Sequence, residues 1–441
     1  MMRKHLTQTR RRLLSANKWK FRLAFWLAAI AVGLIAASFA LLSSTADHFF
    51  HRVYDKSPYI AFAMTPIGLA FIAWLTKKYF PGSEGSGIPQ AIAAISMKHH
   101  ALRSRILSIR IAIAKIGLTC MGLMCGASIG REGPTVHIGA SIMHSLRHFK
   151  FFRGQDMTRG LILAGGAAGI SAAFNTPLAG IMFAIEEMSR SYEDKTTGTL
   201  LIAVIIAGVT ALAVLGNYTY FGSTSVSLTF MQVWPAVLLC GIAGGLLGGL
   251  FSMSLIHGSR RVAPFVSSYP VRVAFICGLI LSLVGFLSGG STYGTGYEEA
   301  KQLMAGEEYV IGFSIYKILA TIASYLSGIP GGIFAPSLSV GAGLGADFSV
   351  LFSDTPAAGI ILLGMVGYFT GVVQTPITAF IIVMEMNDTP SMVLPLMATA
   401  LLAKGISYLV CPTPIYQALA DAYLNKAEQI AEEKTIQTET K

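Results

Sequence analysis

Long apolar stretches separated by short polar segments form the dominant pattern of the chain. One of them, residues 23–44, carries no charged residue over 22 positions. An α-helix rises about 1.5 Å per residue, so this stretch is long enough to cross a hydrocarbon core about 30 Å thick. It is also longer than the apolar part of a cleaved signal peptide, which runs about 7–15 residues. We therefore predict a membrane-spanning helix over these residues.

Composition supports a lipid environment for most of the chain. Of its 441 residues, 53% are hydrophobic and 12% are charged, too few polar residues to cover a soluble globule. Residues 1–22 hold eight Lys and Arg and no acid, which by the positive-inside rule predicts a cytoplasmic N-terminus. The net charge of +11 favours contact with anionic membrane lipid over nucleic-acid binding. We expect a multi-pass protein of a prokaryotic inner membrane, with both termini in the cytoplasm.

Two blocks of sequence occur twice, in the same order. Residues 161–186 (LILAGGAAGISAAFNTPLAGIMFAIE) resemble residues 360–385 (IILLGMVGYFTGVVQTPITAFIIVME) at an offset of 199. Upstream, residues 130–140 (GREGPTVHIGA) correspond to residues 332–342 (GIFAPSLSVGA) at an offset of 202. Transporters built from repeats place their binding site between the two halves.

The repeats divide the chain into five parts. A basic cytoplasmic tail (1–22) precedes the first transmembrane half (23–215), and a polar linker (216–229) leads to the second transmembrane half (230–425). A cytoplasmic tail (426–441) ends the chain.

Two helices inside the repeats are too short to span a bilayer. The segment from Pro177 to Met188 would be about 18 Å long and that from Pro134 to Arg147 about 21 Å. A helix that begins at mid-membrane leaves N–H groups unpaired, which is tolerated only where they face protein or a ligand-bearing cavity. These starts therefore indicate a binding site.

Three glycine-rich segments each lead into a helix: 85–89 (GSGIP), 130–134 (GREGP) and 328–336 (GIPGGIFAP). Glycine lets the backbone turn sharply and leaves its N–H groups accessible. Each helix start carries about +0.5 of a charge, so several converging starts can bind a small anion without a fixed cation. Partial charges also hold an ion weakly enough to release it, which suits transport.

Together and in this order, GSGIP, GREGP and GGIFAP resemble the signature segments of the CLC family of chloride channels and transporters, and the resemblance covers nearly the whole chain. It implies an all-α integral membrane protein of two inverted repeats with many tilted and partial helices. It also implies a homodimer with one anion pathway in each subunit. The implied function is exchange of chloride for protons, with chloride as the transported ligand and no cofactor. A passive chloride channel of the same fold is the alternative.

At the positions that match these motifs, the resemblance implies that the Ser86 hydroxyl and the Tyr416 phenol bind one central chloride. Backbone N–H groups around Glu132 and near Ile333 and Phe334 would line the same path. The expected anion-binding set is Ser86, Gly87, Arg131, Glu132, Gly133, Ile333, Phe334 and Tyr416. Ser86 and Tyr416 also favour chloride over nitrate or fluoride.

Glu132 is the residue for which a functional role is most strongly expected. A carboxylate at a helix start can be a simple cap, but an ionisable residue at membrane depth is costly and usually marks a pathway. Ionised, this carboxylate mimics chloride in the site, and protonated it loses that preference and can swing away. The resemblance assigns Glu132 as the gate.

Glu186 and Glu187 end the short helix that begins at Pro177. Adjacent helical residues point about 100° apart, so at most one of them faces a given cavity. Glu186 corresponds to Glu385 in the repeat, whereas Glu187 corresponds to Met386. This asymmetry suits a structural role for Glu186, and the resemblance assigns Glu187 as the internal proton relay. The alternative is a plain helix end that meets Arg190.

Three further residues need a role. Lys115 is the only charge in residues 111–130, so we expect a carboxylate partner, with Glu187 as the candidate. His137 is expected to pack rather than to carry protons or bind metal, because no second ligand is spaced to join it. Arg131 is expected to order its loop or attract anions.

Neither metal chemistry nor hydrolysis is expected. The five cysteines stand in apolar stretches without the spacing of a metal site or disulfide framework, which favours packing roles. An intramembrane metal-dependent hydrolase built on Glu186 and Glu187 would be a rival function, but the chain contains no H-E-x-x-H motif or Ser/His arrangement to support it.

Overall fold

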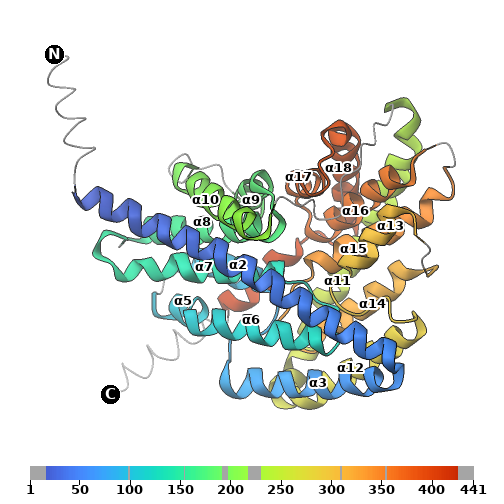
Figure 1. Cartoon of the computed structure of the whole chain (residues 1–441), viewed down its shortest axis with the longest axis horizontal. Helices are drawn as coiled ribbons and strands as arrows, with labels where there is room; N and C mark the ends of the chain where they lie inside the picture. Colours follow the sequence, from blue (N-terminus) through green and yellow to red (C-terminus); the bar gives the residue numbers. More distant parts are fainter. Residues whose placement is uncertain are drawn as a thin grey trace.

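The computed structural model describes residues 16–97, 100–152, 154–190, 197–216, 230–307, 310–352 and 355–425. Among these residues every extended regular element is a helix, and two isolated β-bridges join loops (Figure 1). Eight helices of the described residues are long and apolar enough to cross a membrane. The predicted all-α, multi-pass membrane class is confirmed.

The first half contains α2 (Ala16–Lys56), α3 (Pro58–Tyr79), α4 (Ile88–Ser96), α5 (His100–Ile106), α6 (Ile109–Met124), α7 (Glu132–Ser145), η1 (Leu146–His148), η2 (Lys150–Phe152), α8 (Gln155–Phe174), α9 (Pro177–Phe183), η3 (Ala184–Ser189) and α10 (Thr197–Leu215). Helix α2 contains the predicted span over 23–44 and begins within the segment expected to be a tail. The rest of that tail, 1–15, lies outside the described residues, as does the expected linker apart from Gly216.

The second half contains α11 (Phe230–Ser268), α12 (Pro270–Leu287), α13 (Tyr297–Ala305), α14 (Phe313–Leu326), α15 (Phe334–Ser349), α16 (Ala357–Val373), α17 (Pro376–Met386), η4 (Pro390–Met392) and α18 (Val393–Val410). A last helical segment covers residues 415–425, and the expected tail 426–441 lies outside the described residues. The two halves pack together: α3 lies beside α12, and α9 contacts α17 (Figure 1).

In both halves, a pair of glycines lets two equivalent helices approach each other closely. A β-carbon at Gly139 of α7 would lie 2.2 Å from the carbonyl oxygen of Gly165 in α8. At the repeated positions, a β-carbon at Gly341 of α15 would lie 2.7 Å from the carbonyl oxygen of Gly364 in α16. Only glycine permits such close approach of two helices. The sequence repeat is thus also a repeat of helix packing.

The short helices begin close to where the sequence predicts. Helix α9 begins at Pro177, and its α-helical part ends at Phe183, where the chain continues as a π-helix through Ser189. Helix α7 begins at Glu132, two residues before Pro134. π-Helical turns are rare and occur frequently at functional sites. The one here contains both Glu186 and Glu187.

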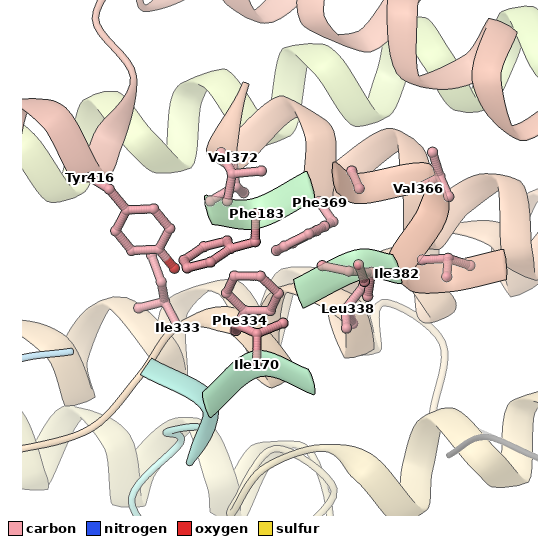
Figure 2. Close-up of a cluster of buried hydrophobic side chains, with 14 of the residues drawn as sticks. Ile170, Phe183, Ile333, Phe334, Leu338, Val366, Phe369, Val372, Ile382 and Tyr416 are labelled. Atoms are coloured by element: carbon pink, nitrogen blue, oxygen red, sulfur yellow. The ribbon is translucent and has the colours of Figure 1, made fainter. Parts of the chain in front are cut away.

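A buried aromatic cluster fills the centre of the protein, between the two halves. The ring of Phe334 lies 5.5 Å from that of Phe174, 6.2 Å from that of Phe183 and 4.4 Å from that of Phe369. Figure 2 shows the Tyr416 ring at the edge of this cluster, with its hydroxyl pointing toward Phe183 and Phe334. The cluster therefore places apolar aromatic rings beside the Tyr416 hydroxyl.

Candidate functional site

The three glycine-rich segments are joined to one another by backbone hydrogen bonds. Gly85 donates to Ile329 O and accepts from Gly331 N, both at 3.2 Å. Gly130 and Gly332 exchange two bonds, of 2.7 and 2.8 Å. Helices α4, α7 and α15 begin two or three residues beyond these bonds, so their N-termini meet in one region. Converging helix starts of this kind favour an anion.

Ser86 and Tyr416 are buried hydroxyls at this meeting point. Ser86 is 0% exposed and Tyr416 is 1% exposed, and neither hydroxyl has a hydrogen-bond partner among the described residues. Tyr416 lies at the start of the helical segment 415–425, beside Ile333, the residue that precedes α15 (Figure 2). Buried polar groups normally have partners, so two such hydroxyls side by side with helix starts are suited to donate to a bound anion.

Glycine at position 133 is required by the Ser86 side chain. A β-carbon there would lie 2.2 Å from Ser86 Oγ, so a larger residue would displace the hydroxyl. Gly87 precedes α4 in the left-handed conformation, with φ of 103°. The structure therefore brings the expected residues Ser86, Gly87 and Gly133 into one site.

Glu132 is the first residue of α7 and is fully buried. Its carboxylate lies over Gly130, because a β-carbon on that glycine would be 2.3 Å from Glu132 Oε2. The same β-carbon position is 3.2 Å from the backbone nitrogen of Ala335, in the first turn of α15. The carboxylate thus lies at the junction of two helix starts, where an anion would be stabilised.

Arg131 connects this junction to α2. Its Nη1 donates to Ala40 O at 2.8 Å and to Ser43 Oγ at 3.3 Å, while its Nε lies 4.0 Å from Glu132 Oε1. It also lines a cavity of about 200 Å³ together with Asp47. Both expected roles of Arg131 fit this position, since it holds its loop and presents a positive charge to a cavity.

Glu186 and Glu385 cap each other's helices across the two halves. Glu385 accepts hydrogen bonds from Leu178 N at 3.1 Å and Ala179 N at 2.9 Å, at the start of α9. Glu186 accepts from Ile377 N at 3.3 Å and from Thr378 N at 2.7 Å, at the start of α17. The exchange satisfies N–H groups that would otherwise be orphaned, and it gives a physical reason for the structural role expected of Glu186.

Glu187 has a different environment. It is 1% exposed, and neither carboxylate oxygen has a hydrogen-bond partner among the described residues. The guanidinium of Arg190 lies 4.0 Å from Glu187 Oε1, so the alternative expectation of a contact with that arginine also holds. The phenol of Tyr416 feels the charges of both Glu187 and Glu132. Both carboxylates are therefore electrostatically coupled to the same tyrosine.

The expected pairing of Lys115 with Glu187 is wrong. The fully buried Lys115 ammonium donates to Gly85 O at 2.9 Å and to Glu84 O at 3.5 Å. Backbone carbonyls satisfy this cation, and the sequence analysis did not consider them because they carry no side-chain signal. Lys115 therefore supports the GSGIP segment rather than a relay carboxylate.

His137 packs against the same segment. Its Nε2 makes a hydrogen bond with Ile106 O at 3.1 Å, and a β-carbon on Gly87 would lie 2.7 Å from the His137 β-carbon. No group of three or more His, Cys, Asp or Glu side chains able to hold a metal occurs within the part of the chain that the structure describes. The geometry supports a packing role for this histidine.

Two tyrosines beside Gly85 were missed by the sequence analysis. A β-carbon on Gly85 would lie 3.8 Å from Tyr423 Oη and 3.9 Å from Tyr325 Oη. Tyr423 also lines a cavity of about 370 Å³ together with Glu84 and Arg105. No local motif marks these tyrosines, because only the fold brings them to the GSGIP segment.

Comparisons with known proteins agree with this geometry. Residues 68–408 match the family model described as voltage gated chloride channel. The H(+)/Cl(−) exchange transporter ClcA of Yersinia pestis bv. Antiqua (strain Angola) is 29% identical over 402 residues, which are 86% of this chain and 82% of that protein.

Solved structures share the fold. The crystal structure of a slow cyanobacterial Cl−/H+ antiporter matches with a TM-score of 0.79 and 26% identity, covering 91% of this chain and 98% of the other. A CLC-type fluoride/proton antiporter matches with a TM-score of 0.76 and 23% identity, covering 90% and 98%, which supports the fold alone.

Proposed function

The chain belongs to the voltage gated chloride channel family, and from this premise we propose that it exchanges chloride for protons across a membrane. Similar proteins named as chloride/proton exchangers support chloride and protons as the transported species. The observation that carries the proposal is the pair of buried carboxylates, Glu132 and Glu187, whose charges both act on the buried Tyr416 phenol. A passive anion pathway has no need for two buried acids at such a cost.

Chloride binds where α4, α7, α15 and the segment 415–425 begin. The hydroxyls of Ser86 and Tyr416 donate to the ion, and both are buried without another partner among the described residues. The Lys115 ammonium does not take this role, since it is engaged by backbone carbonyls. Partial charges and hydroxyls hold the ion loosely, so it can leave.

Glu132 acts as the gate. Its ionised carboxylate competes with chloride for the helix starts, because both are anions and the carboxylate lies beside the N-terminus of α15. Protonation removes this competition and lets chloride occupy the site. One side chain thus excludes the anion when charged and carries the proton when neutral.

Glu187 passes protons between the cytoplasm and Glu132. Its buried carboxylate accepts no hydrogen bond from the described residues, so gaining or losing a proton breaks no hydrogen bond there and alters only the strength of the 4.0 Å ion pair with Arg190. Glu186, one residue earlier, is unsuited to the task because it accepts three hydrogen bonds at the start of α17, from Ile377 N, Thr378 N and the Thr378 hydroxyl.

The protein works as a homodimer in an inner membrane, with both termini in the cytoplasm and anionic lipid around it. The basic residues before and within the first turns of α2 support this orientation. Cross-linking of the purified protein in liposomes, together with protease accessibility of the termini in sealed vesicles, tests the assembly and the orientation.

A chloride gradient across liposomes tests the exchange. The purified protein is reconstituted without a proton gradient, a chloride gradient is imposed, and internal pH is recorded. Exchange predicts proton movement driven uphill by chloride. Chloride flux without proton movement would instead identify a passive channel.

Two variants of adjacent residues test the relay in the same assay. Glu187→Gln keeps the shape but cannot titrate, so chloride flux is expected to continue while proton movement falls to background. Glu186→Gln is the matched control and retains proton movement. If Glu187→Gln still drives protons uphill, the relay begins at another residue.

A further inference from the structure

Basic side chains gather where α4 and α7 end, at the opposite ends of these helices from the anion site. Arg103 is 0% exposed, and its Nε donates to Ala94 O at 2.8 Å while its Nη2 donates to Met97 O. Arg159 Nε donates to Ile95 O at 3.1 Å. These two guanidiniums therefore cap the last carbonyls of α4, where the helix dipole is negative.

Other donors of this group are left without partners. His144, in the last turn of α7, is 1% exposed, and neither of its ring nitrogens has a hydrogen-bond partner among the described residues. The same holds for Arg147 Nε and for Arg103 Nη1. We call Arg103, His144 and Arg147 the basic cluster. Buried donors without acceptors are costly, so the cluster is incomplete as it stands.

The charges around the basic cluster have one sign. Those acting on His144 come from Arg147, Arg103, His148 and His100, and those acting on Arg103 come from Arg159 and Arg147. Within the described part of the chain, none of the ion pairs includes a member of the cluster. Like charges held together in a low dielectric repel, and an anion would relieve the repulsion.

The cluster lies on the side of the molecule where α2 begins. The ring of Phe152, which follows α7 by way of η1, stacks on Phe21 of α2 at 4.4 Å. Exposed Phe149 and Lys150 flank the same loop. An aromatic and a lysine exposed together are typical of the depth of lipid headgroups. Arg147, the partly exposed member of the cluster, is the one that a lipid phosphate or a solute on that side would meet first.

We propose that the basic cluster is a binding site for a phosphate group. A phosphate presents several oxygens, which match the separate donors of two guanidiniums and one imidazole, and arginine binds phosphate through directed, charge-assisted bonds. Chloride is a single sphere without directed acceptor atoms, so it matches the fixed fork of a guanidinium less well than phosphate oxygens do. The occupied site holds the ends of α4 and α7 together, independently of the transport function.

Arg147→Gln is the variant of choice, because Arg147 Nε has no hydrogen-bond partner in the described chain, so the substitution removes no hydrogen bond of that nitrogen. Arg103 is unsuitable, since it caps α4. Arg261→Gln, at an exposed position of α11, is the matched control for the change in charge. His144→Gln serves as a second variant within the cluster.

The full-length protein, purified and delipidated in detergent, is tested by its thermal unfolding midpoint. One arm adds inorganic phosphate against chloride at equal ionic strength, and the other adds phosphatidylglycerol against phosphatidylcholine. Phosphate or phosphatidylglycerol raises the midpoint of wild type and of Arg261→Gln, with apparent affinity on the order of 10-fold weaker in Arg147→Gln and His144→Gln. A response to phosphatidylglycerol alone identifies the lipid headgroup as the source, and a response to inorganic phosphate identifies a soluble one.

Two results would overturn the proposal. One is a wild-type midpoint that neither ligand raises beyond its control. The other is an equal response in Arg147→Gln, His144→Gln and wild type, which would place the binding elsewhere.

Discussion

The starts of α4 and α13 share one backbone arrangement, but among the described residues only the α13 start accepts a side-chain carboxylate. Each follows a Gly-x-Gly segment, 85–87 or 294–296, whose last glycine is left-handed, with φ of 103° or 80°. A buried lysine donates to the carbonyls of each segment: Lys115 bonds Gly85 O, and Lys317 bonds Gly294 O at 3.0 Å. We call each arrangement a cradle: the segment 85–87 with Lys115 in the first half, and the segment 294–296 with Lys317 in the second.

The occupants of the two cradles differ. At α13, Thr295 donates from its hydroxyl to Asp47 Oδ2 at 3.1 Å and from its backbone N at 3.4 Å. At α4, the Ser86 hydroxyl has no partner among the described residues. The protein thus caps one helix start with its own carboxylate, whereas the other is where we propose that chloride binds. Features common to both halves support the fold, whereas the chemistry proposed above falls at positions where the halves differ.

The buried carboxylates also divide into positions that the two halves share and positions that they do not. Glu186 and Glu385 occupy equivalent positions and perform the same capping task. Glu187 corresponds to Met386, and Glu132 corresponds to Phe334. The residues proposed to handle protons are therefore those that the second half lacks.

Removing the shared caps is expected to have the largest effect on stability. Glu186→Ala and Glu385→Ala each leave backbone N–H groups of a helix start unpaired, at a cost of about 1.5–3 kcal/mol. The two losses should be similar, because each carboxylate accepts at least two backbone bonds. Thermal and denaturant unfolding in detergent measures both. A large loss in only one variant would contradict the equivalence of the two caps.

Replacing the hydroxyl of each cradle in turn should separate an effect on chloride binding from an effect on stability. Ser86→Ala removes a donor to chloride and is expected to weaken its binding by roughly 10-fold, because hydrogen bonds to charged groups contribute about 1.5–3 kcal/mol before water compensates. Thr295→Val should leave chloride affinity unchanged and lower stability slightly. Calorimetric titration with chloride compares them, and equal affinities in both variants would rule out Ser86 as a ligand.

Removing the carboxylate that occupies the α13 cradle should give the smallest of the three effects. Asp47→Ala removes the carboxylate at α13, at a cost of about 1 kcal/mol. Chloride should enter the vacated helix start, so the loss is expected to shrink as chloride concentration rises. Unfolding midpoints measured against chloride and against a bulky organic anion test this, and a loss that chloride does not recover would show that the cradles are not equivalent.

Much of the site could be predicted from the sequence because its signals are local. Glycine and proline mark the helix starts at Ser86 and Glu132, and the repeat separates Glu186 from Glu187. Contacts between distant segments leave no such signal. The bond from Lys115 to backbone carbonyls and the insertion of Asp47 at α13 depend on how helices pack, and neither follows from periodicity or spacing.

Paired chloride and proton flux through Glu132→Gln in liposomes most directly tests whether the positions unique to the first half carry the chemistry. Glutamine keeps the size of the side chain and removes both its charge and its proton. The account predicts chloride flux that is nearly independent of pH, with no proton movement, while wild type couples the two. Uphill proton movement retained by Glu132→Gln would contradict both the gate and the exchange mechanism built on it.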